Sequence, residues 1–375
     1  MQDELSTLRH AISAVDDELL QLAAKRLDLA RQVGEYKLRH GLAIKDYEVE
    51  KQIIERTRDR AKQHGIYTEM AESLVKTLIK YSVIAQDELK RPTQGTAKGK
   101  GRRILIVGGG GQMGRWFAHF LDAMGHQVSL WDVHPLPPTE ARFPVPPSLA
   151  EGLAAVDVAI LATPLSATAA IIEQCIPDAG KTAIIDICSL KSPVLPSFRK
   201  ALAAGCKIAS IHPMFGPDIE LLADCNIILC EGGDPEALEA VRQILTPTSA
   251  RLIAVPIDLH DNLMGYVLGA AHLINLVFGS LVAASGLSLG AIQNVAGTTM
   301  KNQMAVAMNV ARENPDLYFE IQRLNAFTPQ LIRSLLATVT RYRDVIAAGS
   351  RADFKNLMAA AHGFFTSEGA TSKEV

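Results

Sequence analysis

The stretch RRILIVGGGGQMGRWF, residues 102–117, gives the strongest indication of the fold. Four apolar residues run into four glycines, and a helical pattern follows. Only one register gives the spacing G-x-G-x-x-G, and it places the glycines at Gly109, Gly111 and Gly114. A strand, a glycine loop and a helix in this order predict a dinucleotide-binding unit.

Each glycine in this spacing has a predicted role. The first makes the tight turn, the second lets backbone N–H groups approach a pyrophosphate, and the third lets helix and strand pack closely. Gly108 and Gly110 are extra in this register. Gln112 and Met113, at the start of the helix, complete the predicted phosphate-binding loop.

The second predicted strand ends at Asp132, 23 residues beyond Gly109. A carboxylate there accepts a hydrogen bond from a ribose 2′-hydroxyl and repels a 2′-phosphate. The next arginine along the chain is Arg142, so the sequence favours NAD over NADP. Thr163 and Pro164, after the third strand, are also expected to contact the cofactor.

Beyond the glycine loop, short apolar runs alternate with helical stretches. The runs lie at residues 104–107, 127–132, 156–163, 182–187, 207–213 and 226–230. This alternation predicts a doubly wound α/β domain of the Rossmann type over residues 102–255. From residue 256 to 375 the pattern is helical, and we expect a domain for dimerisation and substrate binding.

Ligands of a doubly wound sheet bind at the carboxyl ends of its strands. Three segments should end there: LATP (161–164), DICSLKS (186–192) and SIHPMFGPD (210–218). His212 follows a buried strand directly and precedes a stiff turn, so we expect it beside the nicotinamide. A neutral imidazole can accept a hydroxyl proton while hydride leaves, and Ser189 could bind the same oxygen.

The first hundred residues have a different composition. They hold 18 Lys and Arg and 16 Asp and Glu, whereas the other 275 hold only 20 and 24. Apolar residues recur at three- and four-residue steps, which predicts helices at about 5–39, 47–63 and 68–89. Gly41 is expected to cap the first helix. We therefore predict an all-helical domain over residues 1–91 and a linker over 92–101.

Composition excludes several classes of function. A net charge of −2 favours neither nucleic acid nor an anionic membrane as partner. No secretory signal is recognised at the N-terminus, and five cysteines without a CxxC pair suit reduced thiols in the cytoplasm, with neither disulfides nor a metal site. The apolar run 265–287 contains His272, Asn275 and Ser280, which favours a helix buried against another subunit over a membrane span.

The C-terminal region offers further candidates. His260 and His272 lie 12 residues apart, and either could bind substrate. Lys301 and Arg323 are candidate partners for a substrate carboxylate.

At these motifs the chain resembles a known family. VGGGGQMGRWF followed by HPMFGPD resembles bacterial prephenate dehydrogenase, and the first hundred residues resemble the all-helical class of chorismate mutase. Joined in this order, they resemble the bifunctional chorismate mutase/prephenate dehydrogenase family of tyrosine biosynthesis. The resemblance implies that chorismate is rearranged to prephenate, which NAD⁺ then oxidises with loss of CO₂ to 4-hydroxyphenylpyruvate. It also implies a homodimer, with tyrosine as a candidate feedback inhibitor.

The resemblance also assigns residues in the helical domain. Its catalytic residues fall on Arg9, Arg26, Lys37 and Gln86, and its other substrate-binding residues on Asp46, Glu50 and Ser82. Helix geometry agrees: Arg26 and Lys37 are about three turns apart, and Asp46/Glu50 and Ser82/Gln86 are each four residues apart. Arg9 faces elsewhere, as expected if it serves the partner's site in an interlocked dimer.

Two positions depart from the family pattern. Val49 stands where the family usually has an arginine, which leaves the mutase site one cation short. The arginine that binds the ring carboxylate of prephenate falls on Lys301, a point charge without the fork of a guanidinium. Arg323 or a residue of the partner could take this role instead.

Three alternatives remain open at this point. The chain could be a prephenate or arogenate dehydrogenase whose helical domain only dimerises or regulates. It could be a β-hydroxyacid dehydrogenase, although Ala305 stands four residues after Lys301 where those enzymes have asparagine. It could also be an NAD-sensing regulator, against which the placement of Ser189 and His212 argues.

Overall fold

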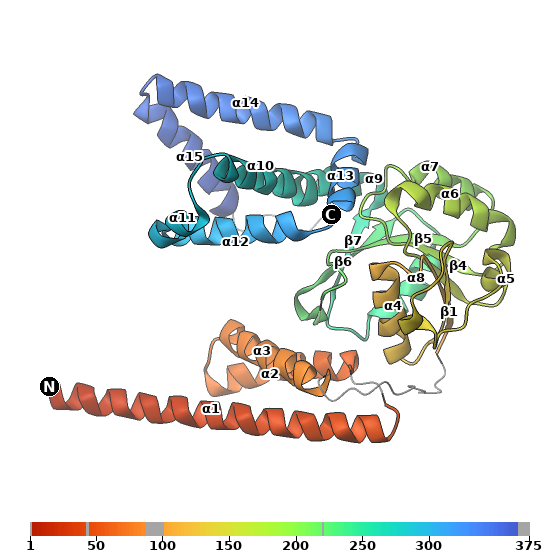
Figure 1. The fold of residues 1–375 in the computed structure, drawn as a ribbon, viewed down its shortest axis with the longest axis horizontal. Helices are drawn as coiled ribbons and strands as arrows, with labels where there is room; N and C mark the ends of the chain where they lie inside the picture. Colours follow the sequence, from red (N-terminus) through yellow and green to blue (C-terminus); the bar gives the residue numbers. More distant parts are fainter. Residues whose placement is uncertain (1, 43–44, 88–100, 220, 367–375) are drawn as a thin grey trace.

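The structure is a computed structural model that describes residues 2–42, 45–87, 101–219 and 221–366. Three parts follow one another along the chain (Figure 1). Three N-terminal helices lie apart from a second group of helices at the C-terminal end, and the sheet lies beside both groups. The predicted fold class, a helical domain followed by an α/β domain and further helices, is confirmed.

The N-terminal helices are α1 (Gln2–Arg39), α2 (Tyr47–His64) and α3 (Thr68–Asp87). Helix α3 packs against both of the others. Gly41 and Gly65 adopt left-handed conformations, with φ of 65° and 67°, at the two chain reversals. The predicted end of the third helix at residue 89 and nearly all of the predicted linker, 92–101, lie outside the described residues.

The sheet has seven strands in the order β2-β1-β3-β4-β5-β6-β7. Their bounds are β1 Arg103–Val107, β2 Gln127–Trp131, β3 Val158–Leu161, β4 Ala183–Asp186, β5 Ile208–Pro213, β6 Asn226–Glu231 and β7 Arg251–Pro256. The helices between them are α4 Gln112–Ala123, α5 Leu149–Ala154, α6 Leu165–Cys175, α7 Leu195–Ala203 and α8 Pro235–Leu245. The strands β1 to β5 pair in parallel, as the doubly wound prediction requires.

The far edge of the sheet differs from the prediction. Strand β6 pairs antiparallel to β5, and β7 pairs parallel to β6. Strand β7 was not predicted from the sequence, although its residues after Arg251 are apolar; in the structure Leu252 and Ile253 are only partly buried.

Both faces of the sheet are covered, so its strands are apolar on both sides. Successive residues of β1 alternate between the faces: Ile104 and Ile106 pack with α4 and α8, whereas Leu105 and Val107 pack with α5, α6 and α7. All four side chains are fully buried.

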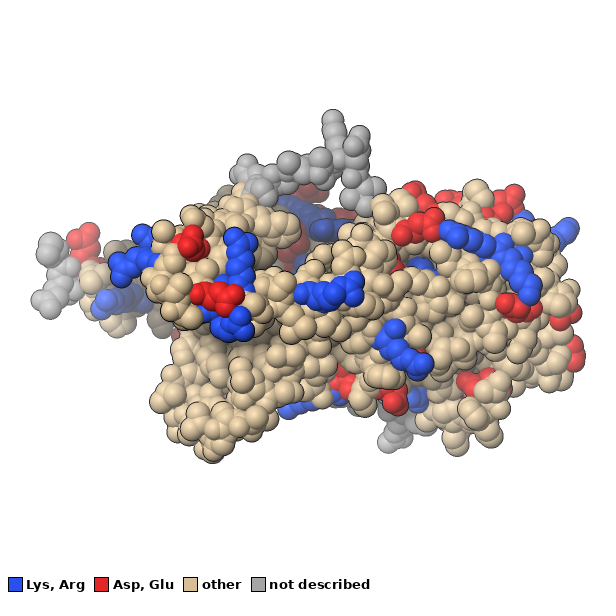
Figure 2. Space-filling view, turned by 90° about the horizontal axis from the view of Figure 1, so that it is seen from above, with Lys and Arg blue, Asp and Glu red and all other residues tan. Residues whose placement is uncertain are grey.

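The C-terminal helices form an open arrangement (Figure 1). They are α9 Ile257–Met264, α10 Ala271–Ala283, α11 Leu289–Val295, α12 Thr298–Arg312, α13 Pro315–Leu324, α14 Thr328–Ala347 and α15 Arg351–Thr366, with a π-helical segment, Gly265–Ala270, joining α9 to α10. Helix α10 has no buried residue although it is strongly apolar. Seen from above, the surface over these helices has a wide area without charged side chains (Figure 2).

The continuous helix Ile257–Ala283 is long and apolar enough to span a membrane, by length and composition alone. Such a helix also occurs at interfaces between subunits.

The N-terminal helices contact the sheet domain. The Tyr47 ring packs edge-on against Phe120 of α4, with 4.9 Å between ring centroids. The Lys51 ammonium donates a hydrogen bond to the carbonyl oxygen of Thr246 at 2.8 Å. Ile54 of α2 belongs to an apolar cluster that includes Leu221, in the loop after β5.

Candidate functional site

The predicted crevice residues lie together along the edge of the sheet that is formed by the carboxyl ends of its parallel strands. Because β3, β4 and β5 are parallel neighbours, the segments that follow Leu161, Asp186 and Pro213 emerge side by side. The glycine loop follows β1 at the same edge. Thr163 and Ser189 therefore lie on the same edge as His212, as predicted, and both are half-buried.

His212 is the first member of a buried chain of hydrogen bonds. Its Nδ1 lies 3.0 Å from Nε2 of His260 in α9, and Nδ1 of His260 lies 2.7 Å from Oδ1 of Asp261. His212 is 4% exposed and His260 is 0% exposed, so only His212 reaches the crevice.

The hydrogen bonds fix the proton positions along this chain. A carboxylate only accepts, so Nδ1 of His260 carries a proton and its Nε2 is left as an acceptor in the neutral ring. Nδ1 of His212 must then be the donor to His260. This leaves Nε2 of His212 with a free lone pair, which is the arrangement that a general base requires.

Asp261 also ties α9 to the loop after β4. Its Oδ1 accepts from the backbone N–H of Lys191 at 2.7 Å, and its Oδ2 accepts from the N–H of Ser192 at 2.6 Å. The side-chain amide of Asn325 donates to the carbonyl oxygen of Asp261. One carboxylate thus orients His260 and holds two elements together.

A buried ion pair lies beside this chain. The Lys191 ammonium contacts Oδ2 of Asp186 at 3.0 Å and donates to the carbonyl oxygens of Cys188 and Ile211. The Ser210 hydroxyl donates to the same Asp186 oxygen at 2.6 Å. All three ammonium donors are therefore satisfied, as a buried charge requires.

Burial and charge set the protonation of these groups. Burial lowers the pKa of His212 well below its ordinary value, and the nearby His260 ring and Lys191 ammonium lower it further. Burial is the largest single effect on Lys191 and opposes its charge, but the Asp186 carboxylate together with Cys230 and Cys188 outweighs it and raises the pKa of Lys191. The imidazole at the crevice is therefore neutral beside a fixed positive charge.

The glycine loop differs from its prediction in one respect. Gly108, which the motif register leaves as extra, has the positive φ of 87°, and a Cβ on it would lie 2.5 Å from the carbonyl oxygen of Ala162. Gly108 and not Gly109 therefore makes the left-handed turn. A Cβ on Gly114 would lie 2.1 Å from the Gly108 carbonyl oxygen, which is the close helix–strand packing predicted for it.

The same loop fits a dinucleotide. Helix α4 begins at Gln112, and its N-cap is Gly111, beside which a Cβ would meet no side chain within 4 Å. Arg115, one turn into α4, has a buried Nε with no hydrogen-bond partner in the described part of the chain. These features leave backbone donors and one cation for phosphate groups.

Asp132 lies beside this loop as predicted. Its Oδ2 accepts from the backbone N–H of Gly110 at 2.9 Å, and its Oδ1 accepts from that of His134. Arg142, the next arginine along the chain, is paired with Asp122 of α4 at 2.9 Å.

A second cluster lies between the N-terminal helices. The Arg26 guanidinium of α1 donates to the Ser82 hydroxyl at 2.5 Å and to the carbonyl oxygen of Leu78 at 2.6 Å. Gln86 lies one turn beyond Ser82 on α3, and both are buried. The predicted grouping of α1 and α3 residues is therefore present.

The first turn of α2 brings a carboxyl group into this cluster. Asp46 caps the helix by accepting from the Val49 N–H at 3.1 Å. Glu50 is 5% exposed, and its Oε2 has no partner in the described residues. Burial raises the pKa of Glu50 to about 7, opposed by Lys45 and Lys37. Arg9 is exposed on α1, away from these groups.

Comparison with known proteins follows this division. Residues 8–87 match the chorismate mutase type II family, and residues 117–254 match the nucleotide-binding domain of prephenate dehydrogenase. The T-protein of Enterobacter agglomerans is 28% identical over 86% of this chain and 82% of its own length. The chorismate mutase of Methanocaldococcus jannaschii is 32% identical over 26% of this chain and 99% of its own length.

The chain belongs to the family that joins a type II chorismate mutase to a prephenate dehydrogenase. A solved prephenate dehydrogenase of A. aeolicus, in complex with hydroxyphenyl propionate and NAD⁺, has the same fold over 71% of this chain and 98% of its own, with a TM-score of 0.57 and 16% identity. We refer below to the crevice as the dehydrogenase site and to the helical cluster as the mutase site.

The structure corrects one assignment at the dehydrogenase site. His260 was predicted to bind substrate, but it is fully buried and both of its ring nitrogens are occupied by His212 and Asp261. It orients the base instead. Two further residues of this site were visible in the sequence but were not predicted. Asp261 directly follows His260, and Lys191 lies in the same segment, 186–192, as Ser189.

Other predicted dehydrogenase residues lie on the C-terminal helices. His272 is half-buried against the Tyr318 ring, with 4.1 Å between ring centroids, and burial lowers its pKa to about 4. Lys301 and Arg323 are exposed, and Lys301 lies on α12, which packs against α10. Within the described residues neither Lys301 nor Arg323 forms an ion pair.

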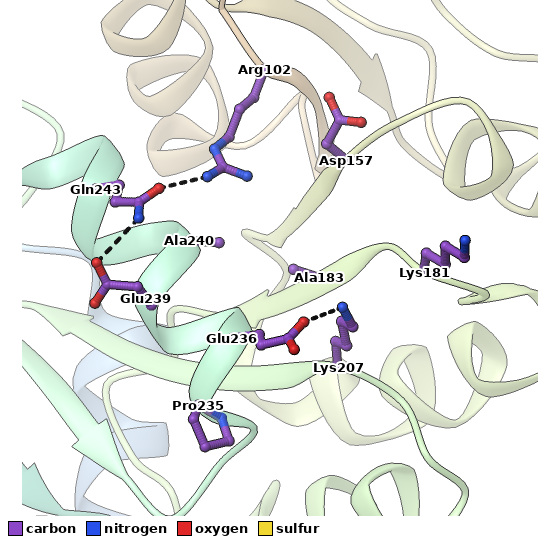
Figure 3. A pocket seen from close by; sticks show the side chains of 10 residues that line it. All are labelled: Arg102, Asp157, Lys181, Ala183, Lys207, Pro235, Glu236, Glu239, Ala240 and Gln243. Carbon is purple, nitrogen blue, oxygen red and sulfur yellow. Dashed lines mark hydrogen bonds and ion pairs between the residues drawn. The ribbon is translucent and has the colours of Figure 1, made fainter.

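A hollow of about 450 Å³ lies at the opposite edge of the sheet (Figure 3). Arg102, Asp157 and Lys181 precede strands there, and α8 supplies Glu236, which pairs with Lys207. Because ligands of doubly wound sheets bind at carboxyl ends, this amino-end hollow is not the dehydrogenase site.

Proposed function

We propose that this chain catalyses two successive reactions at the two sites described above. It rearranges chorismate to prephenate, and it oxidises prephenate with loss of CO₂ to 4-hydroxyphenylpyruvate, with NAD⁺ as cofactor. The observation that carries the second assignment is His212, a neutral base of fixed tautomer, opening at the edge where the glycine loop ends.

The mutase reaction needs positioning and fixed charges, without a general base. Arg26, already held by Ser82, is placed to bind one substrate carboxylate. Lys37 and Gln86 are suited to the ether oxygen, on which negative charge develops in the transition state. Glu50, with an oxygen free to accept, suits a substrate hydroxyl.

The dehydrogenase reaction needs one oriented base. Nε2 of His212 accepts the C4 hydroxyl proton of prephenate, and His260 holds the ring in this tautomer. Asp261 supports the positive charge that the histidine pair acquires. NAD⁺, when bound, accepts the hydride from C4. Ser189 is placed to hydrogen-bond the same substrate oxygen.

The cofactor residues divide by the part of the dinucleotide that they hold. The residues at the start of α4 that would hold the pyrophosphate of a bound dinucleotide are Gly109, Gly111, Gln112, Met113 and Gly114. Asp132 would hold the adenosine ribose of a bound dinucleotide, and Thr163 and Pro164, after β3, would contact its nicotinamide end.

The apolar surfaces support a homodimer. One stripe of α1 carries apolar side chains that are about half exposed: Leu5, Leu8, Ile12, Val15, Leu19 and Leu22. Helix α10 is apolar and unburied in the single chain. Because monomers rarely expose such large apolar patches, a second copy is the partner that we propose for both. In that dimer Arg9 reaches the partner's mutase site.

A dimer also accounts for the span-length helix Ile257–Ala283, so we propose that the enzyme acts in the cytoplasm and not in a membrane. Tyrosine is the proposed inhibitor. The A. aeolicus protein holds hydroxyphenyl propionate, and tyrosine likewise carries a phenol and a carboxylate. Inhibition that increases with tyrosine concentration and is competitive with prephenate would support binding of tyrosine at the dehydrogenase site.

The assay that tests the function supplies purified protein with chorismate, with and without NAD⁺. Loss of chorismate in the absence of NAD⁺ is expected from the mutase. NADH should then appear only after that loss has begun, or at once when prephenate is supplied. A protein that reduces NAD⁺ with prephenate but leaves chorismate unchanged would be a monofunctional dehydrogenase.

A further inference from the structure

The mutase site lacks a charge at one expected position. Val49 stands where the family usually has an arginine, in the first turn of α2, and its side chain is 45% exposed. Its backbone N–H is used by the Asp46 cap. Position 49 therefore contributes no cation to bind chorismate, a substrate with two carboxylates.

Another cation lies on the same turn. Asp46 is the N-cap of α2, so Lys45 is the residue before the cap and Glu50 is the fourth residue of the helix. Side chains at these two positions meet across the first turn of a helix. Lys45 is half-buried there and forms no ion pair or hydrogen bond with the described residues.

The charges that act on Glu50 are consistent with Lys45 lying near it. Of the charged groups that act on the pKa of Glu50, Lys45 has the largest effect, ahead of Asp46 and of Lys37 from α1. On α3, the buried Ser82 and Gln86 carry no charge. Lys45 is thus the opposing charge with the largest effect on the buried carboxyl group, in the turn where position 49 supplies none.

Charge balance gives this lysine a role. Without it, one chain supplies Arg26 and Lys37 against the carboxyl groups of Asp46 and Glu50, which leaves no net charge for a dianion. With Lys45 the cluster carries one net positive charge, before any contribution of the partner's arginine.

We propose that Lys45 supplies the cation that position 49 lacks: it binds a carboxylate of chorismate and favours the ionised form of Glu50 as a hydrogen-bond acceptor. A lysine can do this from a neighbouring position because its four-carbon stem is flexible. The assignment rests on the mutase activity proposed above.

The test compares full-length variants in the chorismate assay. Lys45→Met should raise KM for chorismate about tenfold, as expected for one charge-assisted contact. Lys45→Arg should stay near wild type. Lys62→Met is the control, since Lys62 is exposed near the other end of α2. Val49→Arg, added to Lys45→Met, should restore KM to within about threefold of wild type.

A second readout separates this role from a structural one. Because Lys45 lowers the pKa of Glu50, the pH profile of kcat/KM should move to higher pH in Lys45→Met. Prephenate oxidation and the helical circular dichroism should stay unchanged, which shows that the chain is folded.

The outcomes are distinct. Unchanged KM and pH profile in Lys45→Met would overturn the role of Lys45, as would a loss that Val49→Arg does not repair. If the wild-type chain consumes no chorismate, the mutase activity itself is wrong, and this assignment falls with it.

Discussion

The dehydrogenase and mutase sites of this chain are built in opposite ways. The dehydrogenase base is buried, and every group that orients it comes from the same chain. The mutase site combines charged groups from α1 and the start of α2 with uncharged polar groups from α3, beside an α1 stripe that stays half exposed. The difference follows the chemistry: proton transfer needs one base of fixed tautomer, whereas a rearrangement needs fixed charges that two chains can share.

The largest expected effect is the loss of the base. His212→Asn should lower kcat for NADH formation from prephenate by about 10³-fold, because no other described side chain is placed to take the hydroxyl proton. Chorismate consumption and NAD⁺ affinity, measured on the same preparation, should survive. Near-wild-type turnover would remove His212 from the mechanism and end the contrast between the sites.

A smaller loss is expected one step further from the substrate. Asp261→Asn places an amide where His260 needs an acceptor, so the tautomer of His212 is no longer held, and kcat should fall roughly 10²-fold. Asp258→Asn is the matched control on the same helix, where Asp258 pairs with Arg199 at the surface. Equal effects of the two changes would argue against the hydrogen-bonded chain.

The smallest effect concerns the stability of the mutase helices. The folded pKa of Glu50, about 7, lies above its ordinary value, so the folded state binds this proton more tightly than the unfolded state. The stabilisation that the bound proton gives is therefore complete at acid pH and is lost as pH rises through 7. The free energy of unfolding should fall by about 1 kcal/mol more in wild type than in Glu50→Gln between pH 6 and pH 8. Urea unfolding followed by circular dichroism measures this; parallel pH dependences would mean that Glu50 is not buried as described.

The helices of the mutase half were predictable because their signals are local. An amphipathic period sustained over residues 5–39 and a glycine at each reversal predicted α1 and α2 to within three residues. The parallel strands could be predicted because apolar runs alternate with helical stretches. The position of His212 could be predicted because ligands of a doubly wound sheet bind at the carboxyl ends of its strands. These features depend on neighbours in the sequence.

The remaining features depend on contacts between distant segments. His260 lies behind His212 because Asp261 holds α9 to the backbone of Lys191 and Ser192, about seventy positions earlier. Which glycine takes the positive φ depends on the approach of Ala162 from the next strand, which the motif does not contain. The sequence could show that His260 and Asp261 are polar and close to a predicted site. It could not show which of them contacts substrate and which lies behind His212.

Mixing of defective chains tests the contrast between the two sites most directly. Arg9→Ala and Arg26→Ala chains, co-expressed in equal amounts, should form mixed dimers in about half of the population, each with one intact mutase site. The unsorted mixture should then regain about a quarter of wild-type mutase activity. His212→Asn mixed with Asp261→Asn should regain no NADH formation, since both residues serve one chain. No recovery of the mutase, or recovery of the dehydrogenase, would contradict the account.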